Sequence, residues 1–193
     1  MRSRSNLRRC VLVGRSECTA TRRIYVQDSV YDDFKARLLT RIESCKVGDP
    51  LDPRVEVGPL VNQVQCEEVL TAIDRGRSEG GTLLAGGARV DDSGYVIAPT
   101  LFEGVADDAF LSCSEVFGPV ASLYRFSSLD EGLQRANDVV MGHSAAIFTS
   151  SLSAALRFQE EIEAGLIHVN SQTAGADVHV PFGGIKESGF RST

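Results

Sequence analysis

The sequence lacks tryptophan, paired cysteines and any apolar run long enough to cross a bilayer. Without Trp, the core cannot depend on the largest aromatic side chain. The five cysteines are widely spaced and form no Cys-x-x-Cys pair, which argues against a zinc knuckle or a redox dithiol. The absence of a long apolar run argues against a transmembrane helix. We therefore expect neither a metal site nor a membrane partner.

The charge balance excludes a further class of function. The net charge is -6, from 26 acidic and 20 basic side chains, whereas a nucleic-acid-binding protein usually carries a basic face. A hydrophobic content of 42% and a charged content of 24% are ordinary for a globular protein. The 193 residues suffice for one domain with its own core. Because no secretory signal is evident, we expect reduced thiols and a cytoplasmic location.

Residues 1–16 differ from the rest in composition. They contain five arginines and several serines but no acidic residue, as in a mitochondrial transit peptide. Their position directly before the motif around Cys18 favours a truncated or altered start instead. We expect this segment to be poorly ordered and residues 17–193 to form the domain.

The alternation of helix and strand patterns predicts an α/β fold with a mostly parallel sheet flanked by helices. A capping box at Ser29 and Asp32 predicts the start of the first helix, and Ser128 with Glu131 predicts the start of a later one. The expected strands are 23–27, 82–85, 95–102, 120–126, 145–149 and 166–170, with loop from there to the end. The first two helices are predicted from apolar faces made by Val30, Phe34, Leu38 and Ile42, and by Leu60, Val64, Val69 and Ile73. The later helices are predicted over 128–138 and 152–163, the second ended by Gly165.

Cys18 is the first candidate for chemistry. Small and polar residues follow it, as at an exposed turn, and Arg22 and Arg23 would favour a thiolate through their positive charge, while Glu17 would oppose it. Residue chemistry alone leaves a nucleophile and a structural cysteine equally open.

Two further motifs are ambiguous when each is taken alone. In the run 114–120, Phe117 would be a core residue, Glu115 a solvated acid and Gly118-Pro119 a turn. In the run 181–189, a glycine pair precedes Lys186, but the spacing fits neither a P-loop nor a dinucleotide fingerprint. The three histidines, His143, His168 and His179, have no metal-ligand spacing.

In their order and spacing, these three motifs resemble the catalytic domain of aldehyde dehydrogenases, from about Glu17 to Arg191. The resemblance implies that Cys18 attacks the aldehyde carbon to give a thiohemiacetal. Loss of hydride to a nicotinamide then leaves a thioester, which water hydrolyses. The backbone N–H of Cys18 would hold the oxyanion. The family's base glutamate, its oxyanion asparagine, most of its cofactor-binding domain and its C-terminal oligomerisation strand have no counterpart in this sequence.

The resemblance also implies roles for other residues. Glu115 would accept hydrogen bonds from the nicotinamide ribose of NAD or NADP, and Phe117 would pack nearby. Phe182 would line the substrate tunnel, while Lys186 and Asn170 would hold the scaffold. Ser114 replaces a second glutamate of the family, and His143 stands where the family often has Leu.

The run 173–180 resembles enzymes that oxidise 2-oxoglutarate semialdehyde, which implies a small aldehyde carrying a carboxylate. The predicted function is therefore NAD(P)-dependent oxidation of an aldehyde, by a truncated chain from a family that forms homodimers or homotetramers. Two alternatives stay open: a non-catalytic assembly remnant and a cysteine esterase that needs no nicotinamide.

Overall fold

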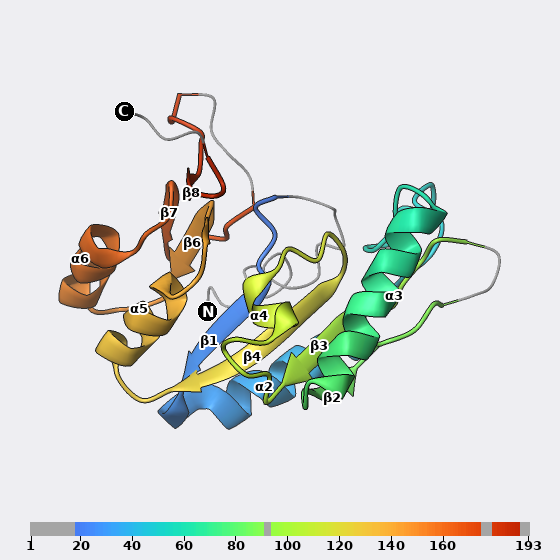
Figure 1. Ribbon diagram of the computed structural model, residues 1–193, viewed down its shortest axis with the longest axis horizontal. Coiled ribbons are helices and arrows are strands. Elements are labelled where there is room, and N and C mark those ends of the chain that lie inside the picture. Colours follow the sequence, from blue (N-terminus) through green and yellow to red (C-terminus); the bar gives the residue numbers. More distant parts are fainter. Residues whose placement is uncertain (1–17, 91–93, 175–178, 190–193) are drawn as a thin grey trace.

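The computed structural model describes residues 18–90, 94–174 and 179–189. The main sheet has four strands. Figure 1 shows long helices packed on it and a smaller group of helices and strands at one side. Residues 1–16, expected to be poorly ordered, lie outside the described residues. The elements in chain order are β1 (Arg23–Gln27), α2 (Asp28–Glu43), α3 (Gln63–Ser78), β2 (Thr82–Ala85), β3 (Thr100–Glu103), α4 (Phe110–Cys113), β4 (Val120–Phe126), α5 (Leu129–Asn137), β5 (Met141–Gly142), β6 (Ser144–Ile147), α6 (Leu152–Glu161), β7 (Leu166–Val169) and β8 (Ile185–Lys186).

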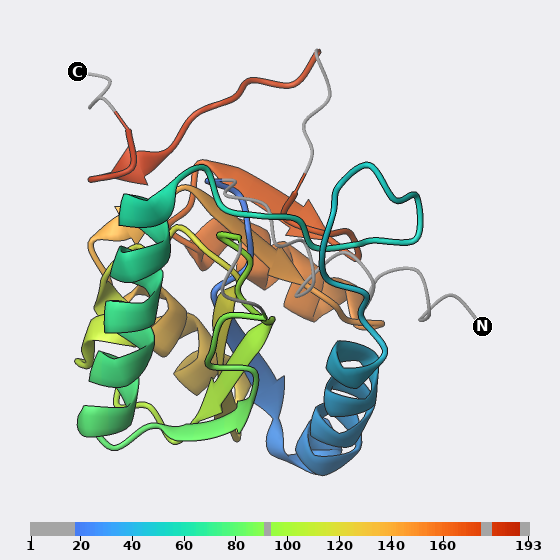
Figure 2. The same cartoon turned by 90° about the vertical axis from the view of Figure 1, so that its right-hand side faces the viewer.

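The main sheet has the order β1-β4-β3-β2 and lies between α2 and α3 (Figure 2). β1 and β3 both pair with β4 in parallel, and only β2 runs antiparallel. Leu101 and Phe102 are both fully buried, and as neighbours on a strand they face opposite sides of the sheet. Leu101 packs in the cluster with α2, and Phe102 packs in the cluster with α3. The predicted α/β fold with a mostly parallel sheet is confirmed.

The smaller group contains a second sheet, made of the two strands β6 and β7. β6 and β7 pair in parallel, with Ser144 opposite Leu166. One face packs on α5 and α6 through a cluster built around Leu133, Phe158 and Ile162. The predicted crossover from β6 through α6 to β7 is thus present.

Of the two predicted N-terminal helix caps, one is present and one is not. Ser128 caps α5 as predicted, since its hydroxyl accepts a hydrogen bond from the Glu131 N–H. The capping box at Ser29 is wrong: α2 begins at Asp28 with Gln27 as its N-cap, and no side chain caps it. The chain passes from β1 into α2 without a loop, so Ser29 is already inside the helix.

Several boundaries and faces also differ from prediction. Val30 and Val64 are exposed, at 54% and 62%, although both were assigned to buried helix faces. The strand predicted as buried over 145–149 is half-buried β6, which ends at Ile147. α6 ends at Glu161, before Gly165. The C-terminal stretch expected to be loop contains β8, which pairs with β5.

Tyr31 takes the buried position that was predicted for Val30. It is 3% exposed, its hydroxyl donates to Glu103 Oε2 at 3.1 Å, and Arg125 lies over its ring at 3.7 Å. Burial, followed by the hydrogen bond to Glu103, raises the pKa of Tyr31 from 10.0 to about 12.

This shift predicts a pH dependence of stability. Because the pKa of Tyr31 is higher in the folded state, the neutral phenol contributes stability that is fully present below its unfolded value. That contribution is lost as the pH rises toward 12. We expect the free energy of unfolding, measured with urea, to decline above about pH 10, and Tyr31→Phe to decline less steeply. Equal declines in both proteins would contradict the assignment.

Candidate active site at the amino ends of the strands

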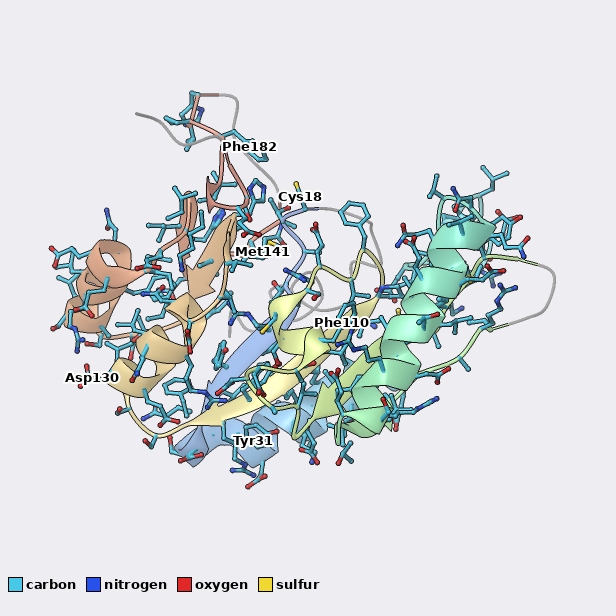
Figure 3. The ribbon with its side chains drawn as sticks, in the orientation of Figure 1. Cys18, Tyr31, Phe110, Asp130, Met141 and Phe182 are labelled. Atoms are coloured by element: carbon cyan, nitrogen blue, oxygen red, sulfur yellow. The ribbon has the colours of Figure 1, made fainter. Side chains whose placement is uncertain are left out.

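The candidate site lies where the parallel strands begin. Cys18 precedes β1, the run 114–119 precedes β4, and His143 precedes β6. Since β1 and β4 are parallel neighbours, the segments before them meet at the same edge of the sheet. In Figure 3, Cys18 and Phe182 both lie at this upper edge of the molecule.

Cys18 is exposed and carries a free thiol. It lies in a turn, and the next residue, Thr19, is buried at 7% exposure. The thiol is therefore accessible while the backbone beside it is anchored. An exposed thiol can reach a substrate, as a nucleophile must. Cys66, by contrast, is fully buried and has the environment of a core cysteine.

Thr173 ties the Cys18 segment to the second sheet. Its hydroxyl hydrogen-bonds the Thr21 hydroxyl, with 2.9 Å between the oxygens. Its carbonyl accepts a hydrogen bond from Ser144 Oγ at 3.4 Å. Sequence reasoning missed Thr21, Thr173 and Ser144, because no local pattern signals a contact between residues so far apart in the chain.

Arg22 and Arg23, both expected to favour a thiolate, have different surroundings. Arg22 donates to the Ser114 carbonyl. Burial lowers the pKa of Arg22, and the charge of nearby Glu115 opposes that shift. Arg23 donates to Tyr25 and to the carbonyls of Arg135 and Ala136 at the end of α5, a favourable position for a cation. Arg22 is therefore the arginine that faces the Glu115 motif.

The run from Glu115 to Pro119 is fixed in place by buried Val116, by the packing of Gly118 and by a hydrogen bond to the Pro119 carbonyl. Val116 is buried, whereas Glu115 is exposed and Phe117 is 36% exposed, so Phe117 is not a core residue. A Cβ added to Gly118 would lie 2.6 Å from Val69 Cγ2, so glycine permits close packing on α3. The Pro119 carbonyl accepts a hydrogen bond from the Thr100 N–H.

Glu115 and Phe117 were predicted to contact a nicotinamide ribose, and that contact stays a prediction. The exposed carboxylate of Glu115 is of a type that accepts hydrogen bonds from a diol, and the half-exposed Phe117 ring lies two residues further along the same run. Arg22 contributes its charge near Glu115.

Phe182 is 57% exposed, and its ring meets that of His143 edge-on, with 5.3 Å between centroids and 74° between planes. Its loop is anchored by Lys186, whose ammonium donates to the carbonyls of Asn137 at 2.6 Å and Val139 at 3.0 Å. The Lys186 side chain also pairs with Glu163. The structural role predicted for Lys186 is thus seen directly.

Asn170 acts as scaffold, as predicted. Its side-chain amide donates to the Thr149 carbonyl, and its oxygen accepts from the Thr149 N–H, both at 2.9 Å. It has a φ of 56°, a conformation that Asn tolerates better than most residues. In the part of the chain that the structure describes, no three His, Cys, Asp or Glu side chains gather as a metal site would require. Nor does any helix there have the length and apolar character needed to cross a bilayer.

Comparisons of the sequence with known proteins all find aldehyde dehydrogenases. Residues 10–193 match the profile of the Aldehyde dehydrogenase family. The alpha-ketoglutaric semialdehyde dehydrogenase of Bacillus subtilis is 39% identical over 180 residues, covering 91% of this chain and 37% of that protein. The betaine aldehyde dehydrogenase of Rhizobium leguminosarum bv. trifolii is 42% identical over 176 residues, covering 90% of this chain and 36% of that protein. The chain therefore spans little more than a third of the length of these relatives.

Solved structures with the same fold as this chain are also aldehyde or related dehydrogenases. Aldehyde dehydrogenase 21 from Physcomitrella patens, in complex with the reaction product succinate, superposes with a TM-score of 0.90 at 29% identity, covering 95% of this chain and 38% of that one. The 1-pyrroline-5-carboxylate dehydrogenase from Thermus with bound NAD gives a TM-score of 0.91 at 32% identity, covering 96% and 36%.

Proposed function

The chain belongs to the aldehyde dehydrogenase family, and from that premise we propose that residues 17–193 form a catalytic domain that carries the cysteine nucleophile for NAD(P)-dependent oxidation of an aldehyde to its acid. The exposed thiol of Cys18, at the sheet edge that also carries Glu115 and Phe182, is the observation that supports this most directly.

The chain's own residues would act as follows. The Cys18 thiolate bonds to the aldehyde carbon, and the carbonyl electron pair moves onto oxygen, where the Cys18 N–H stabilises it. A bound nicotinamide would supply the acceptor for the hydride that leaves this carbon. The acyl group is then held as a thioester on Cys18 until water releases the acid and frees the thiol. Glu115 and Phe117 orient the ribose, and Phe182 lines the substrate side. We assign the base that activates water to no residue of this chain.

The proposed substrate is a small aldehyde that carries a carboxylate. Two relatives named for alpha-ketoglutaric or alpha-ketoglutarate semialdehyde, at 39% and 44% identity, support this class. The betaine aldehyde dehydrogenases among the relatives leave a cationic aldehyde as the competing substrate. We propose a reducing, cytoplasm-like compartment, in keeping with the free thiols of the four described cysteines.

A second candidate is an assembly module that docks on a full-length relative. β7 pairs with β6 on one side, and Ile167 and Val169 on β7 are 36% and 41% exposed. An exposed strand edge invites pairing with another chain. Co-assembly with an intact relative, measured by mass, without aldehyde oxidation would favour this candidate.

Selective alkylation tests the proposed nucleophile. At neutral pH, iodoacetamide is expected to modify Cys18 before Cys45, Cys66 and Cys113. Cys66 is fully buried, and burial raises the pKa of the Cys45 thiol, which lowers its thiolate fraction. Cys113 donates to the Asp107 carbonyl and is half-buried. Peptide mapping over time gives the order of modification. Labelling of Cys18 no faster than Cys113 would count against a nucleophile in this chain.

A further inference from the structure

His143 brings an imidazole into contact with the candidate site. It lies between β5 and β6, and its carbonyl accepts the Leu166 N–H at 2.9 Å, which fixes its backbone at the start of β6. Its ring contacts the Phe182 ring edge-on at 5.3 Å. A leucine at this position would offer only an apolar surface.

The ring carries an unsatisfied polar atom. Nε2 of His143 is buried and has no hydrogen-bond partner among the described residues. A buried polar atom without a partner is destabilising, so such an atom in a native structure calls for an explanation. His168 Nε2 is in the same condition, but His168 lies within β7 and has no ring contact with the Phe182 loop in the described chain.

Hydrogen bonds tie the segment that carries His143 to the segment that carries Cys18. Ser144, its neighbour in sequence, donates to the Thr173 carbonyl, and the Thr173 hydroxyl bonds that of Thr21. Thr21 follows Cys18 in the segment that enters β1. Figure 3 shows Cys18 and Phe182 at the same end of the molecule, and the His143 ring contacts the Phe182 ring there.

We propose that His143 is a specificity-determining residue whose imidazole donates a hydrogen bond to the carboxylate of an aldehyde bound at Cys18. This proposal rests on the proposed function. Imidazole has an N–H donor in either protonation state, so the contact needs no change of charge. Phe182, more than half exposed, has room to turn aside as the substrate enters and opens His143 to it. The donor then gains the acceptor that it lacks in the free protein.

Protection of Cys18 by aldehydes provides the test. An aldehyde adds reversibly to the thiol: the sulfur–carbon bond forms, the thiol proton passes to the aldehyde oxygen, and iodoacetamide is blocked. Succinate semialdehyde is expected to protect Cys18 at a concentration ~10-fold lower than butanal, which has the same chain length without the carboxylate. In His143→Leu, succinate semialdehyde and butanal are expected to protect Cys18 at similar concentrations. Each variant's alkylation rate without aldehyde serves as its own reference.

Two variants serve as controls. His143→Gln keeps an N–H donor and is expected to retain part of the preference, whereas His168→Leu is expected to retain all of it. An undiminished preference in His143→Leu, or none in the unaltered protein, overturns the role of His143 while selective labelling of Cys18 still supports the nucleophile.

A second measurement follows the NMR signal of the His143 ring and does not require a reactive Cys18. In a Cys18→Ala background, the ring NMR signals of the three histidines are followed on adding succinate semialdehyde or butanal. Succinate semialdehyde, but not butanal, is expected to shift the His143 signal and leave those of His168 and His179 in place. A His143 signal that succinate semialdehyde leaves unmoved overturns the proposal.

Discussion

Mixing the chain with p-nitrophenyl acetate is expected to release p-nitrophenolate in a burst equal to the protein present, and Cys18→Ala is expected to abolish that burst. The ester delivers an acyl group directly to the thiol, so the thioester stage is reached without nicotinamide. The thiol of Cys18 is exposed and is the proposed nucleophile, so alanine at this position leaves no thiol there for the ester to acylate. Absorbance gives the size of the burst, and peptide mass gives the acetylated residue.

Cys113→Ala is the matched control for this experiment. Cys113 is half-buried, its thiol donates to the Asp107 carbonyl, and its loss is expected to leave the burst intact. A burst without further turnover supports a nucleophile that depends on a base from elsewhere. Continued turnover, unchanged by NAD and lost in Cys18→Ala, would instead establish the cysteine esterase. A burst that survives Cys18→Ala would refute the assignment of Cys18.

Three of the four strands of the main sheet were predictable because each is a short apolar run bounded by turn residues, whereas β3, predicted over 95–102, spans only Thr100–Glu103. β1, β2 and β4 have the predicted bounds. In β4 the run from Val120 to Tyr124 is buried throughout, as expected for a central strand covered on both faces. Local composition was sufficient because the sheet imposes the same environment on every residue of such a strand.

The helix faces were less predictable because they depend on what the helix meets. Periodicity placed Val30 inward, but α2 turns Tyr31 toward Glu103 on β3, and Val30 faces solvent. The short pairing of β5 with β8 was missed, since two-residue strands carry no periodic signal.

The candidate site shows the same division. The resemblance of three local motifs to a known family predicted Cys18, Glu115, Phe117 and Phe182 as site residues. The contacts of Arg22 with Ser114 and of Thr21 with Thr173 join segments 92 and 152 residues apart. The parallel pairing of β1 with β4 brings Arg22 to Ser114, whereas Thr21 and Thr173 come from segments next to strands of two different sheets. Both contacts depend on the tertiary fold, so no local pattern could reveal them.

Gly165→Ala is expected to destabilise the fold by about 1–3 kcal/mol, the usual effect of forcing extra atoms into a packed interior. A Cβ at Gly165 would lie 2.1 Å from the Gly183 carbonyl oxygen and 2.9 Å from Gly184 Cα. These are backbone atoms, so they cannot turn away as a side chain would, and the loop that carries Phe182 must move. Urea denaturation measures the loss of stability.

Gly183→Ala is the matched control, because it alters the same loop where an added Cβ meets no atom within 4 Å. Its expected effect lies within about 0.5 kcal/mol, as for most surface substitutions. Gly165→Ala should also shift the His143 ring resonance, since the Phe182 ring that packs on it is displaced, whereas Gly183→Ala should not. Equal destabilisation by the two substitutions would mean that the contact between Gly165 and Gly183 does not hold the Phe182 loop. If only Gly165→Ala both destabilises the fold and moves the His143 signal, packing at the start of β7 sets the position of the aromatic ring beside the candidate nucleophile.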